Sequence, residues 1–218
     1  MRKKNIISII IPVFNQEKFI GRCLRSVLSQ KIDRKNYEII VINDGSKDNT
    51  LKILKAFGDE IIILHNKTNK GLPFSINKGI KKSQGEFIVR VDSDDYVNKN
   101  FLYILKLFLK ENSKIDAVSC DYVLVDDKEK FLKRNNSEKN PVGCGIMFRT
   151  KHLLSIGMYD TKFLAHEDKE LRLRFLKKYN IHRIPLALYR YRKHKKNITK
   201  NKKVMNLYFK KLRKKHKF

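Results

Sequence analysis

Three carboxylates crowd into the segment Asp92-Ser93-Asp94-Asp95, which follows the mostly apolar residues 87–91. Carboxylates this close together repel one another and raise each other's pKa unless a cation lies between them. A divalent cation held by one or two carboxylates together with phosphate oxygens is the usual solution in proteins. The segment therefore predicts a cation site at the end of a buried strand. The alternative is a solvated acidic turn that leads into the next helix.

A second candidate is Asp44, which follows the mostly apolar segment 38–42 and precedes Gly45. Glycine lets the backbone approach a ligand closely. The Asp44 carboxylate could therefore accept hydrogen bonds from a nucleobase edge or a ribose. The alternative is an Asx turn that leads into a helix capped by Asp48.

The acidic pair Glu167-Asp168 begins a predicted helix. The helix dipole favours acids in the first turn by about 0.3–1 kcal/mol, which is the structural interpretation. The functional interpretation is a general base on a rigid element, because a carboxylate near a metal and phosphates can activate a hydroxyl group.

His194 lies in the basic segment 190–194. A neutral imidazole there could be a third metal ligand, and the neighbouring arginines could bind a diphosphate. The alternative is a solvated basic segment that binds nothing.

Strands and helices alternate in the first half of the chain, and this alternation positions the motifs. The predicted strands are 6–11, 38–42, 61–64 and 87–91, and the predicted helices are 19–28 (capped by Asn15), 51–57, 73–82 and 101–109. Alternation in units of about 30 residues is typical of an α/β fold with a mostly parallel sheet flanked by helices. Ligands bind beyond the carboxyl ends of such strands. The motifs that begin at Phe14, Asn43 and Asp92 should therefore converge on one crevice.

The second half of the chain is less regular. It predicts strands at 117–125, 142–148 and 184–191, a polar loop at 126–140 and a helix that begins at His166. Pro185 indicates that the last strand lies near an edge of the sheet. From Lys193 onward there are basic residues and no acid, with apolar residues at helical spacing. We therefore expect one domain at 1–192 and a basic tail at 193–218 that forms an amphipathic helix or stays disordered.

The chain has 218 residues, enough for one substantial core, and its 50 Lys and Arg against 22 acids give a net charge of +28. Such a surplus implies affinity for phosphates, nucleic acid or anionic lipid. The alternative is a compositional bias toward Lys, Ile and Asn throughout the chain.

Three cysteines without a CxxC pair predict neither a disulfide framework nor a zinc site, and a reducing compartment is expected. The apolar N-terminal segment is short, contains Pro12 and lacks a small-residue cleavage site, so it is interpreted as a strand rather than a signal peptide. No apolar run approaches the roughly 18 residues that a membrane span needs. The expected location is the cytoplasm.

Five segments, in this order and spacing, resemble the motif series of family 2 glycosyltransferases. They are residues 10–15, residues 41–50, Asn69-Lys70-Gly71 with Asn77-Lys78-Gly79, Asp92-Ser93-Asp94-Asp95 and Glu167-Asp168. The resemblance covers residues 5–195. It implies the GT-A fold of nucleotide-diphospho-sugar transferases, a nucleotide-sugar donor and inversion at the anomeric carbon.

The resemblance also implies roles for individual residues. Asp168 is implied as the catalytic base with Glu167 beside it, and Asp92 and Asp94 as the DxD element. Asp94 is implied as the direct ligand of Mn²⁺ or Mg²⁺, and His194 matches a histidine that many relatives carry. The residues implied on the donor side are Pro12, Phe14, Asn15, Asp44, Gly45, Ser46, Asn69, Gly71, Asn77, Asp92 and Ser93.

Two departures from the family pattern are visible. The usual acidic pair before Gly-Ser is Asn43-Asp44 here, and Ser75-Ile76-Asn77 stands where relatives often have Ala-Arg-Asn. That arginine would contact a phosphate or the base, so its replacement by Ile76 bears on donor affinity or identity.

The implied function is transfer of a sugar to a glycan or lipid-linked acceptor in cell-surface polysaccharide biosynthesis. We expect the tail to attach the protein to the inner face of an anionic membrane. A nucleic-acid-binding protein is an alternative, but it leaves the acidic crevice unexplained. A nucleotidyltransferase should carry a Gly-rich phosphate loop, and residues 12–21 contain none. A catalytically weakened relative is the third alternative.

Overall fold

The structure is a computed structural model that describes residues 2–194 and 197–217. Within these residues the chain forms a nine-stranded sheet in the order β3-β2-β1-β4-β8-β6-β9-β5, with β7 paired to β6. The strands are β1 (Lys3–Val13), β2 (Tyr37–Asn43), β3 (Ile62–His65), β4 (Gly85–Arg90), β5 (Tyr96–Val97), β6 (Ala117–Val125), β7 (Phe131–Asn135), β8 (Ile146–Arg149) and β9 (Ile181–Arg192).

Most of the sheet is parallel. β1 pairs in parallel with β2 and β4, β2 with β3, and β6 with β9. β8 runs antiparallel between β4 and β6, and the short strands β5 and β7 are also antiparallel to their partners. The predicted α/β fold with a mostly parallel sheet is confirmed, and the carboxyl ends of β1, β2 and β4 lie side by side.

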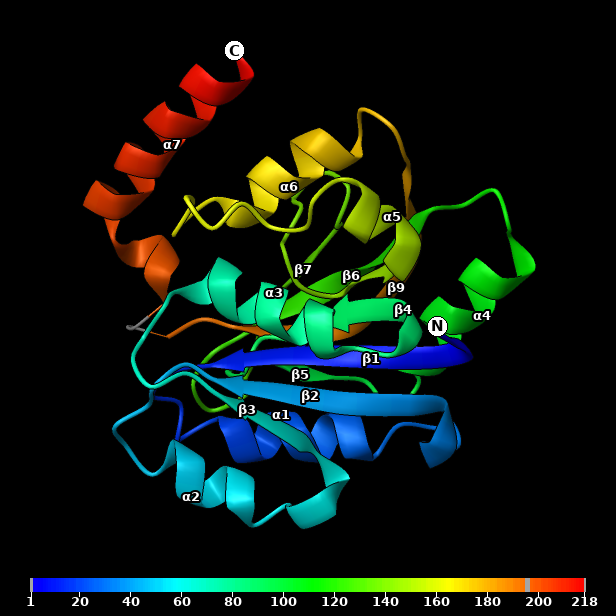
Figure 1. Ribbon diagram of the computed structural model, residues 1–218, viewed down its shortest axis with the longest axis vertical. Helices are drawn as coiled ribbons and strands as arrows, with labels where there is room; N and C mark the ends of the chain where they lie inside the picture. The colour runs from blue at the N-terminus through cyan, green and yellow to red at the C-terminus, as the bar shows by residue number, and fades with distance from the viewer. Residues whose placement is uncertain (1, 195–196, 218) are drawn as a thin grey trace.

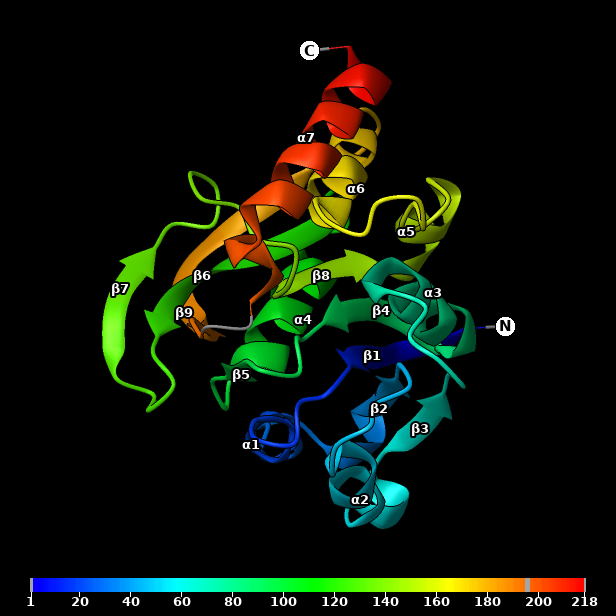
Figure 2. The ribbon, with the colours of Figure 1, turned by 90° about the vertical axis from the view of Figure 1, so that its left-hand side faces the viewer.

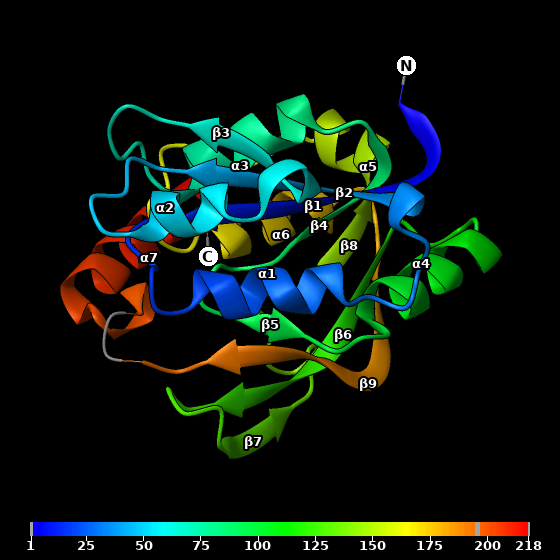
Figure 3. The same cartoon turned by 90° about the horizontal axis from the view of Figure 1, so that it is seen from below.

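Helices cover both faces of the sheet, with α1, α2 and α4 in one core and α3, α5 and α6 in the other (Figure 1, Figure 3). In β1, Ile9 and Ile11 belong to the first core and Ile10 to the second. Burial on both faces explains why the central strands are continuous apolar runs. The helices are α1 (Ile20–Leu28), α2 (Thr50–Lys55), α3 (Leu72–Lys82), α4 (Phe101–Glu111), α5 (Thr150–Ser155), α6 (Glu167–Phe175) and α7 (Lys202–His216), with 3-10 turns η1 (Arg34–Asn36), η2 (Gly58–Glu60) and η3 (Ile198–Lys200).

The second half departs from the sequence prediction in two places. The segment 126–140, predicted as a loop, contains β7, whose exposed residues pair along β6. The strand predicted at 142–148 begins only at Ile146. The last strand does lie next to the edge strand β5, and Pro185 falls at a register shift between β6 and β9, where a missing N–H is tolerated.

The described part of the basic tail is a helix that packs on the domain. Leu212 of α7 is buried, and the ring of Tyr208 lies 6.4 Å from that of Phe163. Lys215 Nζ contacts Asp160 Oδ2 at 2.8 Å and Glu170 Oε1 at 2.6 Å. Figure 2 shows α7 beside α6. In the structure residues 202–216 of the tail are helical, while the domain boundary at residue 192 stays a prediction.

Among the described residues, no helix has the length and apolar character needed to cross a lipid bilayer.

Candidate active site

A cleft of about 610 Å³ opens at the carboxyl ends of β1, β2 and β4, and the segment before α6 forms its other wall. Ten of the residues predicted from the sequence line it: Pro12, Phe14, Asp44, Asn69, Gly71, Asp92, Ser93, Asp94, Glu167 and Asp168. The motifs that follow β1, β2 and β4 thus converge on one cleft, because the ends of parallel strands share one edge of the sheet.

Asp44 is buried at the end of β2 and binds the loop before α3. Its Oδ1 accepts hydrogen bonds from Asn66 Nδ2 at 2.8 Å and from the Lys70 backbone N–H at 2.9 Å. Its Oδ2 accepts a hydrogen bond from the Gly71 N–H, also at 2.9 Å. The carboxylate therefore fixes the position of this loop, and only its remaining lone pairs are left for a ligand.

Asn15, Gly45 and Ser46 are not among the residues that line the cleft, but they join its loops. The Asn15 N–H donates to Ser46 Oγ at 2.9 Å, and Asn15 Oδ1 accepts from the Lys47 N–H at 2.8 Å. The prediction that Asn15 caps α1 is wrong, because that helix begins after Phe19 and Asn15 adopts φ 51° in the loop. The Asn15 side chain is used between two loops instead.

Gly45 is required by close packing. It has φ +74°, and a Cβ placed there would lie 2.8 Å from the carbonyl carbon of Thr68. Any side chain at this position would push apart the loops that carry Asp44 and Asn69.

Asn77 is not among the residues that line the cleft. Its Nδ2 donates to the Tyr159 carbonyl at 2.7 Å and its Oδ1 accepts from the Tyr159 N–H at 3.0 Å. The amide thus ties α3 to the segment before α6, and a donor contact by Asn77 stays a prediction.

Arg90, the last residue of β4, lies between the two acidic motifs. Its Nε and Nη2 contact both oxygens of Asp92, at 2.6 and 3.0 Å. Its Nη1 contacts Glu167 Oε1 at 3.0 Å. Burial raises the pKa of Asp92, against the lowering effect of the Arg90 charge. Burial likewise raises the pKa of Glu167 to about 7, although Arg90 again acts in the opposite direction.

Asp95 lines the cleft and is almost fully buried, and both of its carboxylate oxygens accept hydrogen bonds. Its Oδ1 accepts from the Arg192 N–H at 2.7 Å and its Oδ2 from the Tyr189 hydroxyl at 2.8 Å. Asp95, Asp92 and Cys144 offer ligand atoms within 4.8 Å of one another. Burial, followed by the charges of Asp94 and Asp92, holds the pKa of Asp95 well above its ordinary value. This residue is therefore best placed to anchor β9 to the acidic turn.

Asp94 lies at the cleft surface next to the segment that follows β9. His194 Nε2 lies 2.7 Å from Asp94 Oδ2, and the His194 ring packs on Phe19 with ring centroids 5.2 Å apart. A carboxylate beside an imidazole is a donor set that suits Mn²⁺, and Mg²⁺ also accepts the carboxylate. The chemistry of Asp94 and His194 therefore fits a divalent cation, and His194 is buried and is not among the residues that line the cleft.

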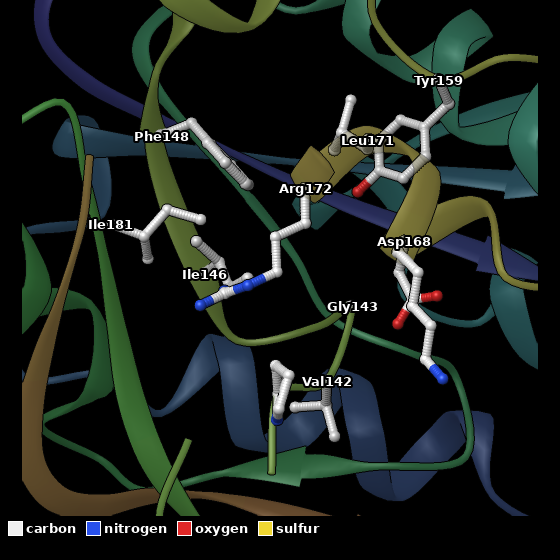
Figure 4. Close-up of a pocket in the computed structure, with 11 residues that line it drawn as sticks. Val142, Gly143, Ile146, Phe148, Tyr159, Asp168, Leu171, Arg172 and Ile181 are labelled. Atoms are coloured by element: carbon white, nitrogen blue, oxygen red, sulfur yellow. The ribbon is translucent and has the colours of Figure 1, made fainter. Parts of the chain in front are cut away.

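Asp168, in the first turn of α6, lines the cleft. Figure 4 shows it beside Gly143. A Cβ at Gly143 would come within 2.5 Å of Asp168 Cβ, so only glycine allows this approach. Asp168 also borders a small side cavity of about 20 Å³. That cavity has room for about one water molecule, so it does not compete with the cleft as a ligand site.

Sequence reasoning missed Arg90 and Gly143. The signal for Arg90 was present, since a lone arginine inside a buried apolar strand has to pair with an acid. Nothing in the sequence around Gly143 indicated its contact with Asp168, because the two residues meet only through the tertiary fold.

The fold is that of the GT-A nucleotide-diphospho-sugar transferases. S. aureus TarS 1-349, solved with UDP-GlcNAc, matches with a TM-score of 0.79 and 23% identity, over 90% of this chain and 61% of that chain. The mannosyltransferase PcManGT of Pyrobaculum calidifontis, solved with GDP-Man and Mn²⁺, matches with a TM-score of 0.73 and 16% identity, over 89% of this chain and 59% of that chain.

Residues 8–168 match the family described as Glycosyl transferase family 2. The chain belongs to this family, as the motif series indicated. It is 32% identical over 190 residues to an uncharacterised glycosyltransferase of Rickettsia typhi, covering 79% of this chain and 59% of the relative. It is 39% identical over 110 residues to a poly(ribitol-phosphate) β-glucosyltransferase of Bacillus spizizenii, covering 49% of this chain and 17% of the relative. The chain thus spans about three fifths of the length of the Rickettsia relative and about one sixth of the length of the Bacillus relative.

Proposed function

We propose that this protein transfers a sugar from a nucleotide-diphosphate donor to an acceptor hydroxyl, with inversion at the anomeric carbon. The observation that carries this proposal is the position of Asp44, Asp94 and Asp168 on one cleft, although they lie far apart in the sequence. Membership of family 2 supports the reaction class. TarS was solved with UDP-GlcNAc, which supports a nucleotide sugar as the donor.

The donor is proposed to lie across the strand ends. Pro12, Phe14 and Asp44 line the part of the cleft suited to the nucleoside, with Asn69 and Gly71 alongside. Phe14 is 41% exposed, which leaves its ring open to contact a base. Asn15, Gly45 and Ser46 act indirectly, because they hold these loops together.

Asp168 is proposed as the general base. Its carboxylate accepts the proton of the acceptor hydroxyl while that oxygen attacks the anomeric carbon from the face opposite the leaving group. The bond from the anomeric carbon to the diphosphate oxygen breaks, its electron pair stays on the diphosphate, and the transition state has oxocarbenium character. Glu167, held by Arg90, orients the first turn of α6 beside Asp168.

Asp94 and His194 are proposed to hold Mn²⁺ or Mg²⁺, and the sequence also assigned Asp92 to this site. When bound, the cation supplies Lewis acidity that stabilises charge on the departing diphosphate. PcManGT was solved with Mn²⁺, which supports metal use by this fold.

The acceptor is proposed to be a cell-surface glycan or a lipid-linked glycan. The relative in Bacillus spizizenii acts on poly(ribitol-phosphate), which supports an acceptor of the cell-surface polymer class.

We also propose that exposed lysines of α7 attach the protein to the cytoplasmic side of an anionic membrane. α7 buries Leu212 against the domain and leaves Lys203, Lys210 and Lys214 exposed. Leu207 and Phe209 of α7 stay exposed, at 63% and 41%, so apolar contact adds to the attraction of anionic lipid, which is about 1 kcal/mol per lysine.

Vesicle flotation tests the attachment. Wild type should float with anionic vesicles and not with neutral ones, and replacing Lys203, Lys210 and Lys214 by Gln should reduce flotation. A control with the exposed Lys52, Lys81 and Lys82 changed to Gln should float like wild type. Equal flotation of both variants would reject attachment through α7.

The proposed reaction is tested by nucleoside diphosphate release from a panel of nucleotide sugars, with and without Mn²⁺ or Mg²⁺. At least one sugar should give metal-dependent release, and Asp94→Ala and Asp168→Asn should lower it. Asp59→Asn, on the exposed turn η2, is the matched control and should behave like wild type. If wild type and both site variants are alike, the assignment of the site is wrong.

A further inference from the structure

The acidic end of the cleft contains a positively charged side chain, that of Arg90. The Arg90 guanidinium is buried at 7% exposure and contacts both oxygens of Asp92 and one oxygen of Glu167, at 2.6 to 3.0 Å. These acids lie at the end of β4 and the start of α6, so one side chain joins the two walls of the cleft. The hydroxyl of Tyr159 also interacts with this guanidinium.

The planar, two-pronged guanidinium of Arg90 determines which atoms of Asp92 are engaged. A bidentate arginine–carboxylate pair has two parallel charge-assisted hydrogen bonds, which a point charge such as lysine does not reproduce. Both Asp92 oxygens are engaged in this way. Asp94, two residues on, contacts His194 and not Arg90. The two aspartates of the same motif therefore differ in what they can offer to a metal ion.

We propose that Arg90 is a positioning residue whose guanidinium holds the carboxylates of Asp92 and Glu167. Asp94 is then the carboxylate that binds the divalent cation, and Asp92 acts on the site only through Arg90. Through Glu167, Arg90 also fixes the first turn of α6 and the direction of Asp168. This inference rests on the proposed metal-dependent transfer and changes the metal role that the sequence gave to Asp92.

The test separates this role from that of an ordinary buried ion pair. Arg90→Met removes a positive charge next to the metal site and frees Asp92, so affinity for MnCl₂ alone, measured by calorimetry without donor, should rise about tenfold. The kcat of sugar transfer should fall about 100-fold, since Arg90 no longer fixes the direction of Asp168 through Glu167. Arg174→Met is the matched control. It breaks the buried Arg174–Glu170 pair of α6, with contacts of 2.6 to 2.9 Å, and should leave Mn²⁺ affinity unchanged.

Two further variants keep the inference testable if Arg90→Met does not fold. Arg90→Lys keeps the charge without the fork, and it should lower kcat while thermal stability stays close to that of wild type. Asp92→Asn should change Mn²⁺ affinity by less than about threefold, and Asp94→Asn should lower it by more than about tenfold.

Mn²⁺ affinity that falls equally in Asp92→Asn and Asp94→Asn would overturn the inference, as would unchanged kcat in Arg90→Lys. Wild type that binds no Mn²⁺ and releases no nucleoside diphosphate would overturn the proposed function itself.

Discussion

At the scale of single residues, Glu167 and Asp168 are adjacent acids with different surroundings. Glu167 is buried against Arg90, and burial raises its pKa to about 7. Asp168 is half-buried and faces the cleft. Neighbouring residues on a helix point about 100° apart, so one contacts the protein while the other faces the substrate. The structure therefore favours Asp168 over Glu167 as the base.

Asp168→Asn should lower kcat of transfer by about 10²–10⁴-fold, the range expected for loss of a general base. The donor KM should change little, because Asp168 lies on the acceptor side in the proposed arrangement. Glu167→Gln should lower kcat less, since its amide oxygen can still accept a hydrogen bond from Arg90. Initial rates with saturating acceptor check this. A larger loss of kcat in Glu167→Gln than in Asp168→Asn would indicate that Glu167, and not Asp168, is the base.

Gly143→Ala should lower transfer because the new methyl group would meet Asp168 Cβ at 2.5 Å. The matched control is Gly21→Ala in α1, where the nearest atom is the flexible end of Arg25 at 3.3 Å. That control should keep full activity and gain about 0.5–1 kcal/mol in free energy of unfolding. Activity assays beside denaturant unfolding separate the two effects, and a fully active Gly143→Ala would argue against a fixed Asp168.

At the scale of elements, α7 is held against the segment before α6 by charge. Burial acts to raise the pKa of Glu170, but Arg174 and Lys215 bring it below its ordinary value of 4.5. A group with a lowered pKa in the folded state stabilises the fold above its unfolded pKa. That contribution is lost as the pH falls through the folded-state pKa. The attachment of α7 should therefore weaken in acid, at a pH below 4.5.

Hydrogen exchange measures this attachment. At neutral pH, Lys215→Met should lower the protection factors of α7 amides, because Lys215 contacts Asp160 and Glu170. Lys214→Met, a change at an exposed neighbour, should not. Once the pH is low enough to protonate both carboxyls, wild type and Lys215→Met should become alike. Equal protection of wild type and Lys215→Met at neutral pH would mean that packing around Leu212, and not charge, holds the helix.

The sequence predicted the elements that carry strong periodicity. β1, β2 and β4 are continuous apolar runs, and their parallel pairing made the convergence of Asp44 and Asp92 predictable. β5 has two residues, too few for any pattern, and β7 is exposed and polar, so both were missed. Contacts between distant segments, such as Arg90 with Glu167, depend on tertiary packing that local patterns do not contain.

At the scale of the whole molecule, a chain with net charge +28 brings six of its 22 acidic residues to one cleft. The Arg90 guanidinium pairs with the carboxylates of Asp92 and Glu167, so the fold supplies part of the neutralisation that close carboxylates need. A divalent cation at Asp94 would add to this internal compensation. The remaining surface stays strongly basic and suits anionic donors, acceptors or membranes.

A crystal structure of the protein with Mn²⁺ and a nucleoside diphosphate tests the central claim most directly. We expect one anomalous Mn²⁺ peak beside Asp94 and His194, a diphosphate bound to it, and the nucleoside in the same cleft toward Asp44 and Phe14. Asp168 should face the empty sugar position. A nucleotide bound outside this cleft, or a metal coordinated away from Asp94, would show that the proposed site is wrong.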